Sequence, residues 1–381
     1  MGRISEIEYI RGMRIFILFL HLLPTYAQID GSATSETRKL YKKLQQISDS
    51  INKNQKILIG QQNAFSEGRG WRKSNQDVES ALISDMQKAV GVSPAVLGLD
   101  FSEIVHWNKD LLKEQMREVY RRGGVVTVSW HAPAWINDGK GNGSSWDTTT
   151  PILSRILPGG DYNHKLNSEL DQLADFFIEI RDVPVIFRPW HEHNGYWFWW
   201  GKNHCTREQY LQLWEVTVSH LQRRGVHNLL YAYSPAGVDK NYLDRYPGDH
   251  YIDVLGVDHY FYNKLFDLFV VGINPLNTYK NGIIWLCEEA AKRNKVPAVT
   301  EFGMETSSYH QFWTDYFGWP LERQGMEQLR GQGSAPRKGP AYIMLWRNDM
   351  TDKKHYYGPI PGHKNNENFK ALMSKGIFQG L

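Results

Sequence analysis

The sequence predicts an α/β protein that folds as a single-domain (β/α)8 barrel, the TIM-barrel fold, on three observations. Eight short apolar runs alternate with segments whose apolar residues have helical spacing. Within the runs the apolar residues are consecutive, which is typical of parallel strands covered on both faces. No glycine-rich fingerprint follows the first run, so an open dinucleotide-binding sheet is not favoured.

The expected elements follow one another along most of the chain. The eight expected strands are residues 57–62, 95–100, 124–131, 183–189, 229–234, 252–258, 296–301 and 341–346. The clearest expected helices are residues 40–51, 78–90, 111–120, 166–180, 210–221 and 283–293. Residues 138–158, rich in Gly, Ser and Thr, are expected to form a long loop on the functional face after the third strand.

Length and composition restrict the class of protein. A chain of 381 residues suits one large barrel. Its 44 basic and 41 acidic residues are nearly balanced and form no basic stripe, so we expect no nucleic acid partner. Cys205 and Cys287 are too few for a thiolate zinc site, and their spacing leaves open whether they form a disulfide. We expect a monomer that uses no metal and no cofactor.

The first 27 residues have the pattern of a secretory signal peptide, with Met13 as an alternative start. Arginines precede an apolar run over residues 15–23, and small residues precede a cut after Ala27. The run is too short for a membrane-spanning helix, and the cut site has no cysteine for a lipid anchor. We therefore expect residues 28–381 to be a secreted or periplasmic catalytic domain that is not inserted in a membrane.

The stretch most informative about function is RPWHEHNGYWFWWG at residues 188–201. Glu192 lies between two histidines, directly after the fourth expected strand, and five aromatic residues follow within eight positions. Flat aromatic rings stack on the C–H faces of sugars, and a carboxyl group can protonate a glycosidic oxygen. Asn194 and Gly195 indicate a loop, where binding and catalytic residues concentrate. The stretch therefore indicates a sugar-cleaving site.

Active residues of such barrels lie at the C-terminal ends of the strands. The polar and aromatic side chains found there are His131, Arg188, His191, Glu192, Asp258, Tyr260, Glu301, Trp346 and Arg347. Asp100, which also ends a strand, and His193 are expected to be structural. If the loop turns at Trp199 and Trp200, one of them is expected to face the core and the other the groove.

Two carboxyl groups end the fourth and seventh strands, Glu192 and Glu301, and these strands face each other across the barrel. Glycoside hydrolysis uses one carboxyl group that protonates the leaving oxygen and a second that is ionised. Apolar surroundings raise a carboxyl pKa, whereas a cation or a hydrogen-bond donor lowers it. Aromatic neighbours favour Glu192 as the acid/base, and Arg188 and Tyr260 are expected to keep Glu301 ionised as the nucleophile.

These motifs resemble glycoside hydrolase family 26. The resemblance rests on residues 188–201 and on the TEFG motif at 300–303, and it continues in residues 129–131, 144–147, 257–260 and 346–349. It implies a (β/α)8 barrel and a retaining mechanism with Glu192 as the proton donor and Glu301 as the nucleophile. It also implies a sugar-binding role for His131, Trp146, His191, Trp197, Asp258, Tyr260, Trp346 and Arg347.

Members of this family are typically β-mannanases, so the resemblance implies an endo-β-1,4-mannanase that acts on mannan, glucomannan or galactomannan. An exo-acting mannobiose-releasing mannanase, a mixed-linkage β-glucanase and a β-1,3-xylanase stay open within the family. A carbohydrate-binding protein without catalysis would use the same aromatic residues but needs no paired carboxyl groups. A metal hydrolase would use His191 and His193 as ligands at positions i and i+2.

Overall fold

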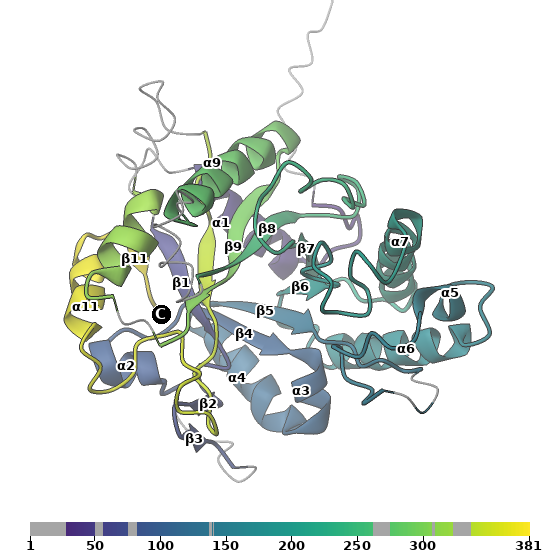
Figure 1. The fold of residues 1–381 in the computed structure, drawn as a ribbon, viewed down its shortest axis with the longest axis horizontal. Helices are drawn as coiled ribbons and strands as arrows, with labels where there is room; N and C mark the ends of the chain where they lie inside the picture. The colour runs from purple at the N-terminus through teal and green to yellow at the C-terminus, as the bar shows by residue number, and fades with distance from the viewer. Residues whose placement is uncertain are drawn as a thin grey trace, which may run out of the picture.

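The computed structural model describes residues 28–49, 56–74, 82–136, 139, 141–261, 275–306, 309–322 and 337–381. Its centre is a closed barrel of eight parallel strands, which confirms the (β/α)8 fold (Figure 1). Around the ring lie β1 (Ile57–Gln62), β4 (Val96–Asp100), β5 (Val125–Trp130), β6 (Val185–Pro189), β7 (Leu229–Tyr233), β8 (Val254–Phe261), β9 (Val296–Met304) and β10 (Tyr342–Leu345). β10 pairs with β1 and closes the ring. Each expected strand agrees with one of these to within three residues at either end.

Helices surround the strands (Figure 1). They are α1 (Ser35–Asp49), α2 (Asp85–Val90), α3 (Phe101–His106), α4 (Lys109–Arg121), α5 (Leu153–Ile156), α6 (Asn163–Glu179), α7 (Arg207–Arg223), α9 (Pro275–Arg293) and α11 (Asn366–Ser374). A π-helix, η2 (Phe312–Gly318), and a 3₁₀-helix, η3 (Trp319–Leu321), precede β10. The short strands β2 (Glu67–Gly68) and β3 (Trp71–Arg72) form a hairpin, and β11 (Phe378–Gln379) pairs with the start of β1.

All six expected helices have a counterpart, with one shortened. The helix expected over residues 78–90 begins at Asp85, where the Ser84 side chain accepts a hydrogen bond from the Gln87 N–H. Residues 78–81 lie outside the described part of the chain, as do residues 50–51 and the expected signal peptide. The expected loop at 138–158 contains the short helix α5. This helix was not predicted, because four helical residues are too few to produce a periodic pattern.

Side chains on the strands alternate between two apolar clusters. On β1, Ile57 and Ile59 pack with the helices around the barrel, whereas Leu58 belongs to the inner cluster. Leu40 and Leu44 of α1 join that inner cluster together with the first residues of several strands. The helix α1 therefore closes the N-terminal end of the barrel, and the C-terminal end is left for a site.

A bulge in β9 determines which side chains face the interior at the C-terminal end. Val299 lies opposite Val257, but the next pair is Glu301 and Asp258, so Thr300 is the additional residue. Both Thr300 and Glu301 then face inward, where the Thr300 hydroxyl donates to Asp258 over 2.7 Å. Regular alternation would turn Glu301 toward the surrounding helices, so the bulge is required to bring this carboxyl group into the barrel mouth.

Two further expectations concern membranes and cysteines. Among the helices of the described residues, none has both the length and the apolar character needed to cross a bilayer. Cys205 and Cys287 are both free thiols, with Cys287 buried in the outer cluster. The two cysteines therefore do not form the disulfide that their number would allow.

Candidate active site

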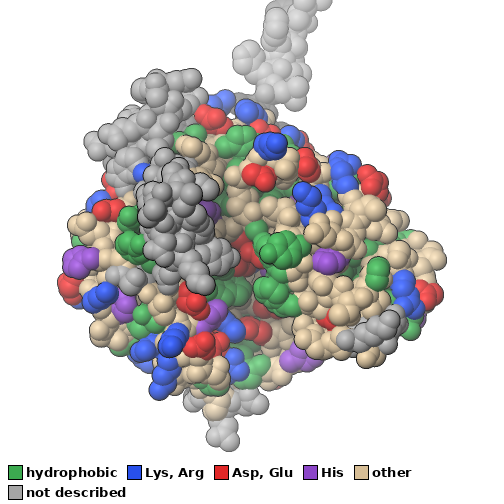
Figure 2. Space-filling model, viewed as in Figure 1, with side chains coloured by type: hydrophobic (Ala, Val, Ile, Leu, Met, Phe, Trp, Pro, Cys, Tyr) green, Lys and Arg blue, Asp and Glu red, His purple; other side chains and the backbone are tan. Residues whose placement is uncertain are grey.

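A cavity of about 810 Å³ lies at the C-terminal ends of the strands. Its walls are formed by His131, Trp146, His191, Glu192, Tyr196, Trp197, Phe198, Ala236, Gly237, Asp258, His259, Tyr260, Glu301, Trp346, His355 and Tyr357. Both predicted catalytic carboxyl groups and every predicted sugar-binding residue except Arg347 are among them. Figure 2 shows a hollow near the centre of the molecule, with acidic side chains at its bottom and a hydrophobic patch beside it.

The backbone around Glu192 has an unusual conformation. Trp190 and Glu192 have φ angles of 54° and 53°, in the left-handed region that residues other than glycine rarely adopt. The Glu192 N–H donates to the Ser234 carbonyl over 2.8 Å, and the Gly195 N–H donates to the Glu192 carbonyl over 2.9 Å. Backbone strain of this kind persists only where the surroundings fix it, and it is concentrated at active sites. These contacts fix the direction in which the Glu192 side chain leaves the loop.

The pKa of the Glu192 carboxyl group is suited to a general acid. Burial, followed by the neighbouring charge of Glu301, raises the pKa of Glu192 from 4.5 to about 7. The indole N–H of Trp197 donates to Oε2 of Glu192 over 2.7 Å and acts in the opposite direction. A carboxyl group with a pKa near 7 is about half protonated at neutral pH, so a large fraction of the protein can donate the proton to a leaving group.

The Glu301 carboxylate is held at both oxygens. Arg188 donates to Oε1, and the Tyr260 hydroxyl donates to Oε2 over 2.6 Å, as the sequence predicted for both partners. One carboxylate oxygen each of Glu192, Asp258 and Glu301 lies within 4.8 Å of the other two. Retaining glycosidases place their two carboxyl groups about 5–5.5 Å apart, and inverting ones roughly 6.5–9.5 Å. The spacing of Glu192 and Glu301 agrees with the shorter class.

Asp258 lies beneath the two glutamates and is almost fully buried. Arg188 donates to its Oδ2 over 2.7 Å and to the Ser234 hydroxyl over 3.1 Å. Burial raises the pKa of Asp258 well above its ordinary value, with Arg188 opposing and the carboxylates of Glu301 and Glu192 adding to the rise. Arg188 thus bonds two of the three carboxylates and compensates their buried negative charge. The main contact of Asp258 is therefore with this arginine.

His131 and His191 form a hydrogen-bonded chain with Asp100. The Asp100 carboxylate contacts Nδ1 of His131 at 2.7 Å and accepts the Ser129 hydroxyl at 2.7 Å, and the two Nε2 atoms of the histidines are 3.2 Å apart. Burial opposes the charged form of His131, but Asp100 raises its pKa; burial and Arg188 hold the pKa of His191 well below its ordinary value. Asp100 therefore has the expected structural role, as the partner that orients His131.

Aromatic rings form the rim of the cavity. Trp146 is 62% exposed and Tyr196 is 68% exposed, values unusual for such large side chains. The Phe198 ring packs edge-on against Trp146 with centroids 5.1 Å apart. Gly195 is required here because a Cβ atom at this position would lie 2.4 Å from the Trp197 ring. The loop therefore presents flat apolar surfaces of the kind that stack on sugar rings.

Several cavity residues were not predicted. Tyr196 and Phe198 lie in the aromatic stretch at residues 188–201, but the sequence does not indicate which rings of this stretch face the groove. His355 and Tyr357 come from the loop after β10, where Tyr357 packs edge-on against Tyr260 at 5.6 Å. They are not at a strand end, so the barrel rule does not identify them.

The predicted placement of Trp199 and Trp200 needs correction. Trp199 and Trp200 are both fully buried, and their indole N–H groups donate to the carbonyls of Ala132 and His191. Neither ring faces the groove, because the loop folds back on the barrel and uses both as core. His193 turns away from His191 and packs against the rings of Tyr210 and Tyr233, as expected for a structural residue. The paired histidine ligands of the metal-hydrolase alternative are therefore absent from the described site.

Arg347 is the one predicted sugar-binding residue outside the wall of the cavity. Its guanidinium group forms ion pairs with Glu67 at 3.3 Å, Glu103 at 3.1 Å and Asp349 at 3.1 Å. Burial, followed by the charge of Asp100, raises the pKa of Glu103 to about 7 against the opposing effect of Arg347. The structure thus places Arg347 in a charged cluster beside the cavity.

A barrel with a raised-pKa carboxyl group facing a second carboxylate, surrounded by exposed aromatic rings, belongs to the class of glycoside hydrolases. Comparison with known families agrees, because residues 29–319 match the model of "Glycosyl hydrolase family 26". The chain belongs to this family, as the sequence motifs predicted.

Several individual relatives and solved structures that are similar to this chain are mannanases. The chain is 34% identical over 367 residues to a mannan endo-1,4-β-mannosidase of Bifidobacterium adolescentis, which covers 90% of this chain but only 34% of that protein. The chain therefore spans about a third of the length of this curated relative. The solved structure of a family 26 β-mannanase from Bacteroides ovatus is 31% identical, with a TM-score of 0.74 over 91% of this chain and 95% of that one. The catalytic domain of a Bacillus sp. JAMB-750 endo-β-1,4-mannanase is 28% identical, with a TM-score of 0.78 over 93% of each chain.

Proposed function

We propose that the chain is a retaining endo-β-1,4-mannanase that hydrolyses mannan, glucomannan or galactomannan by double displacement. The observation that carries the proposal is the pair of carboxyl groups, Glu192 and Glu301, with oxygens within 4.8 Å and with the pKa of Glu192 at about 7. A carbohydrate-binding protein without catalysis has no need for this pair, because burying it is unfavourable.

In the first half of the reaction, a carboxylate oxygen of Glu301 attacks the anomeric carbon while Glu192 gives its proton to the departing glycosidic oxygen. The C–O bond to the leaving sugar breaks as the bond to Glu301 forms, so the intermediate is a glycosyl ester on Glu301. Arg188 and Tyr260 orient the attacking carboxylate through their hydrogen bonds to its two oxygens.

In the second half, ionised Glu192 takes a proton from water, and the water oxygen attacks the anomeric carbon from the side that the leaving group vacated. The ester bond to Glu301 breaks, and the product keeps the original anomeric configuration. The loss of the Glu301 charge in the intermediate lowers the pKa of Glu192, because that charge is one of the causes that raise it. This change suits Glu192 to act first as an acid and then as a base.

The remaining cavity residues are assigned to sugar binding. His131, whose pKa is raised by Asp100, and neutral His191 offer hydrogen bonds beside Glu192. Trp146, Trp197 and Trp346 offer ring faces or edges to the sugar. Asp258 and Tyr260 complete the wall on the side of Glu301, and Arg347 contributes from its charged cluster.

Mannan as the substrate is supported by the similarity to the B. adolescentis mannan endo-1,4-β-mannosidase and to the B. ovatus and JAMB-750 mannanase structures. We propose further that residues 1–27 are a signal peptide, that residues 28–381 are a secreted or periplasmic catalytic domain, and that this domain acts as a monomer without a cofactor. Size-exclusion chromatography and N-terminal sequencing of the exported protein would test these points.

The direct test is an assay of the purified protein on mannan, lichenan and β-1,3-xylan, with sizing of the products. We expect mixed oligosaccharides to be released early from mannan; mannobiose alone would indicate exo-action, and rapid release only from lichenan would reject the substrate. Proton NMR of the first product tests the mechanism, since an inverted anomer would exclude Glu301 as a nucleophile. Activity that survives a chelator excludes the metal-hydrolase alternative.

A further inference from the structure

A second cavity lies beside the catalytic one, between the loop that follows β6 and the loop that follows β7. It has a volume of about 670 Å³, within the range of small-molecule sites. The two cavities share a wall, because the side chain of Asn194 lines the second cavity and hydrogen-bonds the backbone of Ala236, which lines the first. Both of these bonds are 2.8 Å long, so the wall is fixed.

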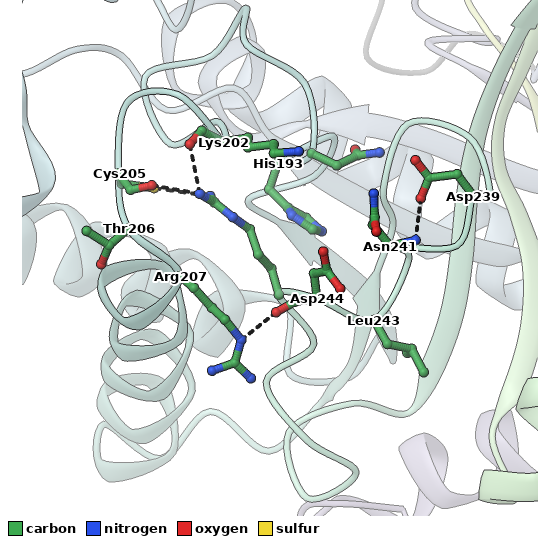
Figure 3. A pocket seen from close by; sticks show the side chains of 11 residues that line it. His193, Lys202, Cys205, Thr206, Arg207, Asp239, Asn241, Leu243 and Asp244 are labelled. Carbon is green, nitrogen blue, oxygen red and sulfur yellow. Dashed lines mark hydrogen bonds between the residues drawn. The ribbon is translucent and has the colours of Figure 1, made fainter.

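Side chains of both charges line this cavity (Figure 3). They are Lys202, Arg207, Asp239 and Asp244, and the Arg207 Nε–H donates to the backbone carbonyl of Asp244 over 2.5 Å. In the part of the chain that the structure describes, none of these four side chains is in an ion pair. Asn241 adds a side-chain amide whose oxygen and nitrogen have no hydrogen-bond partner among the described residues. The cavity therefore offers both donors and acceptors to a ligand.

His193 lies in the middle of this group (Figure 3). It is 2% exposed, and neither ring nitrogen has a hydrogen-bond partner among the described residues. Burial and the nearby charge of Arg245 hold its pKa well below the ordinary value, so the ring is neutral, with one donor and one acceptor. Both nitrogens are buried polar atoms at the wall of the cavity whose hydrogen-bonding capacity is unused among the described residues.

These groups select the chemistry of the ligand. A simple anion would meet the carboxylates of Asp239 and Asp244, and a metal ion would meet Lys202 and Arg207. A neutral molecule with neighbouring hydroxyl groups satisfies both sets, because each hydroxyl donates one hydrogen bond and accepts others. Leu243 supplies an apolar surface for a C–H face.

We propose that this cavity binds a sugar unit of the polysaccharide outside the catalytic cavity, an inference that rests on the proposed function. Because the two cavities share the Asn194–Ala236 wall, a chain or branch held in the second is kept close to the first. Such a second contact raises the effective concentration of long or branched substrates at Glu192 and Glu301. Short oligosaccharides that fill only the catalytic cavity gain nothing from it.

The test compares a polymer with a short substrate. The double variant Asn241→Ala/Asp244→Ala removes two polar side chains that have no hydrogen-bond partner among the described residues, and the bond from Arg207 to the Asp244 backbone carbonyl is kept. We expect the ratio of kcat/KM on galactomannan to kcat/KM on mannotetraose to fall at least about fivefold, as for the loss of two hydrogen bonds. Asn241→Trp, which fills the cavity, should lower the ratio in the same way. Lys240→Ala, exposed on the same loop but outside the cavity, is the matched control and should leave the ratio unchanged.

The outcomes separate the two proposals. A wild-type protein that releases nothing from galactomannan overturns the proposed function and this inference with it. Full wild-type activity with an unchanged ratio in both cavity variants overturns the inference alone. Calorimetric titration of the Glu301→Ala protein with inorganic phosphate serves as a further probe. If phosphate binds and Arg207→Ala abolishes that binding, while the double variant binds galactomannan as well as its parent, the cavity is an anion site and the proposed sugar site is overturned.

Discussion

Replacing Glu192 by Gln should stabilise the folded chain increasingly as the pH rises. Burial and Glu301 raise the pKa of Glu192 from 4.5 to about 7 in the folded state. When the folded-state pKa of a carboxyl group is the higher one, stability is lost as the pH rises from the unfolded value to the folded value. At about 1.4 kcal/mol per pH unit the full shift corresponds to about 3 kcal/mol, and solvent around this partly exposed side chain reduces that to roughly 1–2 kcal/mol.

Urea unfolding of both proteins between pH 4.5 and pH 8.5 would measure the effect. The two free energies of unfolding should nearly agree at the low end and differ by about 1–2 kcal/mol at the high end, because only the wild type must bury a charge there. Glu114→Gln, an exposed residue paired with Arg117 on α4, controls for the loss of one negative charge. The same variant of Glu192 should lower kcat by about 10²–10⁴. A stability difference independent of pH would refute the raised pKa of Glu192.

Three other changes test the neighbouring groups. Glu301→Ala should lower kcat by about 10³ or more, and added azide should restore turnover with an inverted glycosyl azide as product, detected by NMR. Trp197→Phe removes a hydrogen bond that lowers the pKa of Glu192, so the alkaline limb of the pH profile of kcat/KM should move to higher pH. An alkaline limb at the same pH would contradict an effect of Trp197 on the pKa of Glu192. Asp100→Asn should lower the pKa of His131, measured from its ring protons, and raise KM; an unchanged titration would contradict the contact at 2.7 Å.

The sequence predicted those parts of the fold that produce a pattern among residues close together in the chain. Buried parallel strands are continuous apolar runs, and all eight were located to within three residues. The rule that polar residues at strand ends converge placed Glu192 and Glu301 in one cavity. Arg188 and Tyr260 were identified as partners of Glu301 for the same reason, since each lies near a strand end on the same rim.

Other features depend on packing between distant segments. The bulge at Thr300 leaves no mark in the sequence, yet it decides that Glu301 faces inward. Trp199 and Trp200 carry the same composition signal as Trp197, and only the path of the loop makes two of them core and one a partner of Glu192. The cavity between the loops after β6 and β7 likewise requires the two loops to be placed in space.

The different roles of Glu192 and Glu301 follow from their different contacts with the positive charge of Arg188. Glu192, Glu301 and Asp258 lie within 4.8 Å of one another, but Arg188 hydrogen-bonds only Glu301 and Asp258. Tyr260 adds a second donor to Glu301, whereas among the described residues Glu192 receives a single donor, the neutral indole of Trp197. Of the two glutamates, Glu192 therefore has the more weakly compensated oxygens, so it is the one of this pair that is expected to carry a proton. Moving a donor from Glu301 to Glu192 should exchange their protonation and abolish the reaction.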